Sequence, residues 1–314
     1  MVPLSSLPAQ VAPAPTAQPY RWVTLGTMGG PLTSLDRREP ANVLMTPDGP
    51  ILVDAGDGAA TQLGGAGVRL QQLKAIFISH HHFDHVGGLM GVLGLRNQLS
   101  TATPLTIYGP PRTRELIAGV LAGMQPSAQT GYGVEGEKTI APATNITVVE
   151  MADGDTARVG GMTVTAVDNT HYAPDDRITA TPFRSLSFRF DTPVRSIVYT
   201  GDTGPSKAVE RLAKGADLLV SEVIDLDATV AKVGRLLPNM PAAEKERMVT
   251  HLRDQHLTTQ EVGLLAKAAG VKMVVLTHLA GGGDSAPGAA KRYEAEVTAV
   301  SGKPTVMAND LDSF

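Results

Sequence analysis

The sequence predicts an α/β protein in which several strands are covered on both faces. Short apolar runs alternate with helical segments from residue 20 to the end of the 314-residue chain. Some runs, such as the one within "PILVDAG" (50–56) and the one within "KMVVLTH" (272–278), are continuously apolar, which is typical of strands buried on both sides. Apolar residues make up 42% of the chain and charged residues 18%, a composition that can supply a sizeable core.

The predicted elements are short and follow one another along the chain. Strands are predicted at 20–26, 41–46, 50–56, 74–80, 104–109, 145–151, 162–169, 185–190, 196–202, 217–223, 272–278 and 303–310. Helices are predicted at 59–66, 86–98, 111–123, 206–214, 227–237, 241–253, 258–269 and 286–300. The helix at 258–269 has a sequence signal at each end. Thr258 can cap its start together with Glu261, and Gly270 follows its last turn. With no internal repeat and no linker between two cores, residues 20–314 are expected to form a single domain.

Composition excludes several classes of chemistry. The chain has no cysteine, which rules out disulfides, thiolate metal ligands and a cysteine nucleophile. The net charge is −4 and no basic run is present, so the sequence gives no reason to expect a nucleic-acid or membrane surface. No apolar stretch approaches the ~18 residues of a membrane span.

The N-terminal stretch 1–19 is rich in Pro and Ala and carries no charge. It lacks the continuous apolar region of a signal peptide, so a disordered leader is expected there. Because such leaders often follow a cleavage site, a periplasmic or secreted location is slightly favoured over a cytoplasmic one, and a plain N-terminal extension without export is the alternative.

A metal site is predicted directly after the strand at 74–80. Four of the eight histidines lie within 80–85, in the pattern His80-x-His82-x-Asp84-His85. Residues two apart on an extended segment point the same way, so His80 and His82 can share one metal ion. Asp84 and His85 stand where the chain turns into a helix and can face a second ion. Imidazole nitrogen and carboxylate oxygen are suited to Zn²⁺, with Mn and Fe as alternatives.

Other predicted strand ends supply the rest of a ligand set. His171, Asp202 and His278 each follow an apolar strand, where open α/β sheets place their chemistry. Taken singly, each residue is as well explained by a turn or a helix cap. Taken together, they complete two sites: His80, His82 and His171 hold one ion, Asp84, His85 and His278 hold the other, and Asp202 bridges them.

On these residues the chain resembles the metallo-β-lactamase superfamily of hydrolases, over nearly everything after residue 20. The resemblance implies a four-layer αββα sandwich as a single catalytic domain. It also implies two divalent metal ions per chain, most often Zn²⁺, with a bridging hydroxide as nucleophile. Asp54 in "LVDAG" matches the aspartate that supports the metal ligands in this family, and Asp84 is expected to be catalytic as well as ligating.

Within the superfamily the chain is most similar to the ribonuclease Z-like branch. The bridging Asp202, the opening "VTLGTMGGP" and the stretch "HLTTQEVGLLAKAAGVKMVVLTH" carry this resemblance. It implies that His256 donates a proton during catalysis and that Glu222 supports it. Ser221 departs from the histidine common at its position, and a plain structural place beside the helix cap is the alternative for His256.

The expected substrate is a small ester. Only 30 residues (172–201) separate His171 from Asp202, too few for the long arm with which tRNA-processing members of the branch hold tRNA. The segment 225–255 is expected to form a helical cap with Leu236, Leu237, Met240 and Met248 as candidate apolar lining. Arg177 and Tyr132 are candidate substrate contacts, with solvated loop positions as the alternative.

The segments "GGPLTSLDRREPANVLM", "YGPPRT" and "AAGVKMVVLTHL" resemble the arylsulfatase-like group, so hydrolysis of a sulfate ester is expected. A phosphodiesterase or phosphotriesterase, a lactonase or carboxylesterase, and a tRNA 3′-processing endonuclease are the alternatives, the last disfavoured by the missing arm. A metal-binding protein without catalysis is a further alternative, against which the proton donor argues. The partners expected are a small-molecule ester and a second copy of the chain, without nucleic acid or membrane.

Overall fold

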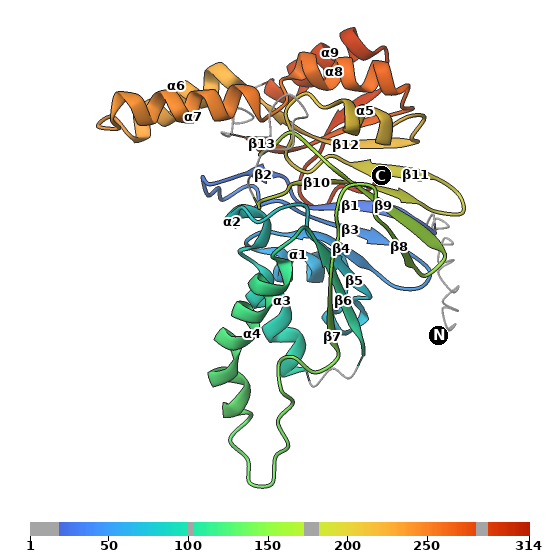
Figure 1. The fold of residues 1–314 in the computed structure, drawn as a ribbon, viewed down its shortest axis with the longest axis vertical. Coiled ribbons are helices and arrows are strands. Elements are labelled where there is room, and N and C mark those ends of the chain that lie inside the picture. The colour runs from blue at the N-terminus through green and yellow to red at the C-terminus, as the bar shows by residue number, and fades with distance from the viewer. Residues whose placement is uncertain (1–18, 100–102, 173–181, 281–287) are drawn as a thin grey trace, which may run out of the picture.

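Two twisted β-sheets stacked face to face make up the centre of the protein (Figure 1). The computed structural model describes residues 19–99, 103–172, 182–280 and 288–314, and most of the predicted leader lies outside these ranges. The first sheet has the strand order β1-β3-β4-β5-β6-β7 and the second the order β14-β13-β12-β11-β10-β9-β8, with β2 paired to β13. The strands are β1 (Arg21–Gly26), β2 (Met28–Gly29), β3 (Ala41–Met45), β4 (Ile51–Ala55), β5 (Ala75–Phe77), β6 (Leu105–Gly109), β7 (Ile146–Glu150), β8 (Thr156–Val159), β9 (Met162–Asp168), β10 (Leu186–Asp191), β11 (Ser196–Tyr199), β12 (Leu218–Ile224), β13 (Val274–Ala280) and β14 (Thr305–Met307).

Helices cover the outer face of each sheet (Figure 1). In the first half of the chain they are α1 (Ala59–Gly65), α2 (Phe83–Val86), α3 (Leu89–Gln98) and α4 (Thr113–Thr130), with the short 3₁₀ turn η1 (Leu70–Gln72). In the second half they are α5 (Lys207–Leu212), α6 (Leu226–Leu236), α7 (Ala242–Asp254), α8 (Thr259–Ala269) and α9 (Ala289–Ser301). The arrangement is helix, sheet, sheet, helix, so the predicted four-layer sandwich is confirmed.

Successive side chains of the buried strands point to opposite faces of each sheet, so the apolar residues form three separate cores. In β4, Leu52 packs with the helices of the first half, whereas Ile51 and Val53 point to the space between the sheets. In β11, Val198 packs with the outer helices of the second half and Tyr199 points inward. Because successive side chains of a strand leave on opposite faces, a continuously apolar strand serves two cores at once.

The predicted helix at 86–98 is broken near its start, because Val86 is the last residue of α2 and α3 begins at Leu89. The chain leaves α2 at Gly87 and enters α3 after Gly88, whose backbone N–H donates to the carbonyl oxygen of Ala55 over 2.8 Å. A Cβ at position 88 would stand 2.1 Å from the carbonyl oxygen of Gly56, so only glycine allows this close approach. The turn fixes α2, and with it two of the predicted ligands, against the end of β4.

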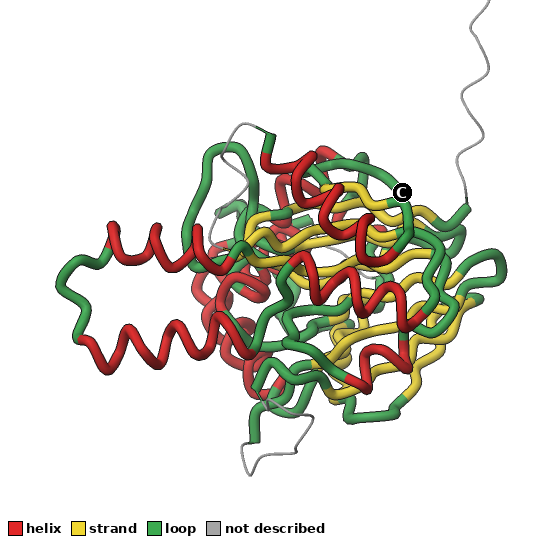
Figure 2. Tube along the Cα trace, turned by 90° about the horizontal axis from the view of Figure 1, so that it is seen from above, coloured by secondary structure: helices red, strands yellow, loops and turns green. Residues whose placement is uncertain are grey.

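Helices α6 and α7 form an antiparallel hairpin that extends away from the sandwich (Figure 2). The predicted helices at 227–237 and 241–253 correspond to these two helices. Three of the predicted lining residues, Leu236, Leu237 and Met248, line a cavity beside the predicted ligands, whereas Met240 lines a separate cavity inside the hairpin. Among the described residues, no helix combines the length and the apolar character needed to span a bilayer.

Candidate metal centre

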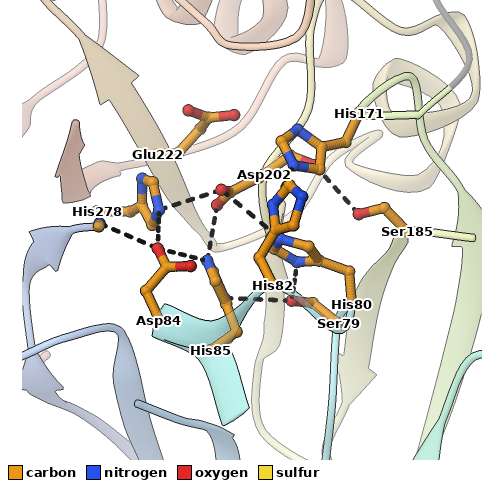
Figure 3. Close-up of polar contacts among 12 residues, drawn as sticks. Ser79, His80, His82, Asp84, His85, His171, Ser185, Asp202, Glu222 and His278 are labelled. Carbon is orange, nitrogen blue, oxygen red and sulfur yellow. Dashed lines mark hydrogen bonds and ion pairs between the residues drawn. The ribbon is translucent and has the colours of Figure 1, made fainter. Parts of the chain in front are cut away.

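The seven predicted ligands lie together at one edge of the two sheets (Figure 3). His80 follows β5, His82 precedes α2, and Asp84 and His85 lie on α2. His171 follows β9, Asp202 follows β11, and His278 lies within β13. Strand ends of both sheets therefore meet here, which is why residues almost 200 positions apart in sequence can share one site.

The donor atoms fall into two groups that share Asp202. One group contains His80, His82, His171 and Asp202, and the other contains Asp84, His85, Asp202 and His278; within each, the donor atoms lie within 4.8 Å of one another. The Asp202 carboxylate reaches both groups, with Oδ2 3.8 Å from Nε2 of His80 and Oδ1 3.3 Å from Nε2 of His85. These are the two sets inferred from the sequence, and the shared carboxylate has the position of a bridging ligand.

Several of these donor atoms are buried without a hydrogen-bond partner. Nε2 of His80, Nε2 of His85, Oδ1 of Asp202 and both ring nitrogens of His278 are in this state. A buried polar atom without a partner costs roughly 1–3 kcal/mol, so a cluster of such atoms requires compensation. Divalent cations would supply it, and the imidazole and carboxylate donors suit them.

Asp54 orients the ligand His85 from behind. Its carboxylate is fully buried and accepts hydrogen bonds from the backbone N–H and the hydroxyl of Ser79, both at 2.7 Å, and from the hydroxyl of Tyr199 at 2.8 Å. It also accepts from Nδ1 of His85 at 2.8 Å. The proton of His85 is thus held at Nδ1, and Nε2 is left free to bind a metal ion.

The backbone fixes His171 in the same way. Its Nδ1 donates to the carbonyl oxygen of Gln255 over 3.0 Å, and its Nε2 lies 3.0 Å from Nδ1 of His82. Burial lowers the pKa of His171 well below its usual value and lowers the pKa of His82 to about 4. Burial also lowers the pKa of His80 well below the usual value, so all three imidazoles are neutral and able to ligate.

The other group carries more negative charge. Burial lowers the pKa of His278, but the Asp202 carboxylate 3.1 Å away outweighs it and raises the pKa to about 10. Burial also lowers the pKa of His85, but the carboxylates of Asp202, Asp84 and Asp54 outweigh it and raise this pKa well above its usual value. Protonated His278 and His85 therefore balance the negative charge of the carboxylates. A divalent cation would balance the same charge in place of these protons.

His256 and Glu222 form a buried pair next to the ligands. Nδ1 of His256 lies 2.6 Å from Oε2 of Glu222, and Oε1 of Glu222 accepts the backbone N–H of Thr203 at 2.5 Å. Burial lowers the pKa of His256, but Glu222 outweighs it and raises the pKa above its usual value. The ring centroid of His256 is 5.1 Å from that of His171 and 6.0 Å from that of His278, so the pair stands beside both groups.

A cavity of about 450 Å³ opens over the ligands. Its floor is polar and contains His82, Asp84, Asp202, His256 and His278. Its walls are mostly apolar and come from the α6–α7 hairpin, from Gly30–Leu32 and from α2. The walls are lined by Gly30, Pro31, Leu32, Phe83, Thr229, Val233, Leu236, Leu237, Met248, His251, Leu252 and Ala280.

Sequence reasoning missed four residues of this site. His251 on α7 lines the cavity and groups with His171 and His256, and the side chain of Gln255 is hydrogen-bonded to it. Tyr199 donates to Asp54, and Phe83 lines the cavity from α2. A histidine five positions before His256 was the available signal for His251, because α7 continues almost to the predicted proton donor.

The two candidate substrate contacts have different outcomes. Tyr132 is exposed at the end of α4 and donates its hydroxyl to the carbonyl oxygen of Gln98 over 2.8 Å. It lines a separate cavity between α3 and α4, so the expectation that it lines the substrate pocket is not met. The packing of α4 against α3 carries it away from the strand ends. Arg177 lies outside the described residues.

Comparisons with known proteins agree with this geometry. The family model described as "Beta-lactamase superfamily domain" matches residues 50–279. The chain is 30% identical over 260 residues to a ribonuclease Z of Mycolicibacterium paratuberculosis, covering 82% of this chain and 85% of the relative. It is 29% identical over 259 residues to a ribonuclease Z of Mycobacterium bovis, with the same two coverages.

Solved structures show the same fold. The metallo-β-lactamase fold protein YhfI from Bacillus subtilis superposes with a TM-score of 0.67 at 20% identity, covering 94% of this chain and 98% of that one. The short form of human tRNase Z superposes with a TM-score of 0.64 at 23% identity, with the same coverages.

These relatives overturn one prediction. A small-molecule ester was expected as partner and nucleic acid was not, and this is wrong, because the relatives that the chain matches over most of its length are ribonucleases. The low charge of the chain was a poor guide, because net charge alone says little about a local phosphate site. The chain belongs to the beta-lactamase superfamily, as a metal-dependent hydrolase of its ribonuclease Z-like branch that acts on ester bonds.

Proposed function

We propose that this protein is a dinuclear zinc phosphodiesterase of the ribonuclease Z type that hydrolyses a phosphodiester bond in RNA. The observation that carries the proposal is the buried His256–Glu222 pair, 2.6 Å apart, beside two ligand groups that share Asp202. A purely structural metal site has no use for a proton donor. The similarity to ribonuclease Z over 82% of the chain supports RNA as the substrate class.

The ligand residues define what the bound ions do. Bound there, two divalent ions would supply an activated water molecule and would neutralise the charge that develops on the phosphoryl oxygens. His80, His82 and His171 would hold one ion, Asp84, His85 and His278 the other, and Asp202 both. Asp54 holds His85 in the required tautomer. The set of five histidines and two aspartates favours Zn²⁺, with Mn and Fe as alternatives.

His256 supplies the proton for the leaving oxygen. Its Nδ1 proton is held by Glu222, so Nε2 carries the proton that is transferred. The raised pKa of His256 keeps this proton on the ring near neutral pH. Because Glu222 is itself tied to the backbone N–H of Thr203, the imidazole is held in one orientation next to the Asp202 loop.

The direct test is cleavage of precursor tRNA with a 3′ trailer by the zinc-loaded protein, alongside bis(p-nitrophenyl) phosphate. Cleavage of both, lost on chelation and restored by Zn²⁺, is the expected result. The matched control is the His256→Ala variant, which should retain its metal and lose RNA cleavage. Metal-loaded protein that hydrolyses neither substrate would refute the proposal.

Hydrolysis of an aryl sulfate ester is a second candidate for the same site. One observation favours it: the walls of the cavity are mostly apolar, with Leu236, Leu237 and Met248 contributed by the hairpin. A sulfate ester needs the same charge stabilisation and the same proton donor as a phosphodiester. Adding p-nitrophenyl sulfate to the assay separates the two, because a higher kcat/KM for the sulfate than for the phosphodiester would reverse the order of these candidates.

A further inference from the structure

Phe83 is the most unusual apolar side chain of the site. It is 82% exposed, although burial of a phenylalanine is worth roughly 1.5–3 kcal/mol. It lies on α2 between the two ligand positions His82 and Asp84, and it lines the cavity over the metal centre. A large exposed aromatic side chain at the mouth of a catalytic cavity marks a binding contact.

The position of Phe83 is held by the backbone around it. Its carbonyl oxygen accepts the N–H of Gly87 at 2.7 Å, and Gly88 anchors the next turn to Ala55. The two neighbours of Phe83 in sequence are part of the ligand groups. The backbone that carries the ring is therefore fixed beside the candidate ligands, and binding on the ring requires little ordering of the main chain.

The wall formed by the hairpin is aliphatic. Leu236 and Leu237 are 54% and 52% exposed, and Met248 lines the same cavity. Figure 1 shows α2 and the α6–α7 hairpin at the same end of the sheets. A flat apolar group bound in this cavity has one aromatic wall and one aliphatic wall, with the metal ligands at the floor.

We infer that Phe83 is a substrate-binding residue that stacks on a planar ring next to the scissile ester, with the hairpin as the opposite wall. The inference rests on the proposed function and names its subsite: in an RNA substrate, the ring is the base next to the scissile phosphate. Stacking on an aromatic side chain accepts every base, because every base has a π-face.

A binding experiment on the zinc-loaded protein tests the subsite without turnover. Adenosine 5′-monophosphate, phenyl phosphate and ribose 5-phosphate share the phosphate, but only the first two carry a ring. Calorimetry on the wild type should show tighter binding of the ring compounds. Phe83→Ala should weaken these by on the order of ten-fold and leave ribose 5-phosphate unchanged, whereas Phe83→Trp should preserve the preference.

Two controls keep the result specific. Metal content of each variant is measured, because Phe83 lies between two ligand positions. Leu35→Ala removes an apolar side chain that is 93% exposed and does not line the cavity, and it should change nothing.

Equal loss of affinity for all three compounds in Phe83→Ala, or no loss for any, would overturn the inference. Preference for phenyl phosphate over the nucleotide would place an aryl group, instead of a base, on Phe83 and overturn the assignment to RNA. Failure of the proposed function gives a different result: precursor tRNA is not cleaved, whatever the binding preference.

Discussion

The metal centre and the α6–α7 hairpin differ in how they are held. The ligands stand at strand ends of two stacked sheets, are mostly buried, and are fixed by partners such as Asp54, Ser79 and the carbonyl oxygen of Gln255. The hairpin extends from the sandwich, and its residues Leu236 and Leu237 are about half exposed. The candidate ligands are thus held by hydrogen bonds within the sandwich, whereas the hairpin presents half-exposed apolar side chains beside them.

The two regions meet at the end of α7. Gln255 caps the end of this helix, its carbonyl oxygen accepts a hydrogen bond from the candidate ligand His171, and the next residue is the proposed proton donor His256. One short segment therefore ties the hairpin to both the metal ligands and the acid. Variants in each region test whether the candidate ligands and the hairpin contribute separately to catalysis and to substrate binding.

The largest effect is expected from Asp202→Ala. This carboxylate belongs to both ligand groups, so its removal should reduce the metal content of both and lower activity by roughly 10³-fold or more. Elemental analysis together with diester hydrolysis is the measurement. Asp217→Ala is the control, since that carboxylate pairs with Lys272 and Ser196 away from the site. Full metal occupancy in Asp202→Ala would show that the two groups bind independently of it.

The second-largest loss of activity is expected from His256→Ala. General acid catalysis contributes typically ~10²–10⁴-fold, and its value grows as the leaving oxygen becomes more basic. The variant should slow phosphodiesters with alkoxide leaving groups much more than nitrophenyl esters, with unchanged metal content. Glu222→Gln should give a milder version, because it loosens the orientation of the imidazole. Kinetics across leaving groups of graded pKa measure this, and a uniform loss would assign His256 to pocket shape.

The smallest effect is expected from the hairpin double variant Leu236→Ser and Leu237→Ser. It should raise KM several-fold through lost apolar contact, about 0.8 kcal/mol for each methylene no longer buried, with little change in kcat. The control is Leu264→Ser, which alters a leucine of α8 with the similar exposure of 51% outside this cavity. Steady-state kinetics on an aryl diester separate the two constants. A loss confined to kcat would mean that the hairpin acts on chemistry.

Much of this protein follows from local patterns of its sequence. The sequence grouped the seven candidate ligands with Asp54, His256 and Glu222, and the structure brings these residues together. Most of them lie at or near the end of a strand, and strand ends gather at one edge of a sheet. The helix ends at Thr258 and Gly270 were also predictable, and the structure shows the capping box and the left-handed glycine there.

Only the tertiary structure decided how the elements lie across one another. Tyr132 was a candidate substrate contact from the sequence, but the direction of α4 places it at a different cavity. His251 and Phe83 lie close in sequence to His256 and to the ligand motif, but only the packing of α7 and α2 shows that both line the cavity. The division of the helix at 86–98 required the close approach of Gly88 to the backbone of Gly56. Such contacts join residues far apart in sequence, so local periodicity cannot reveal them. The candidate ligands were visible because four of them stand in one short motif and the others lie at or near the ends of apolar strands.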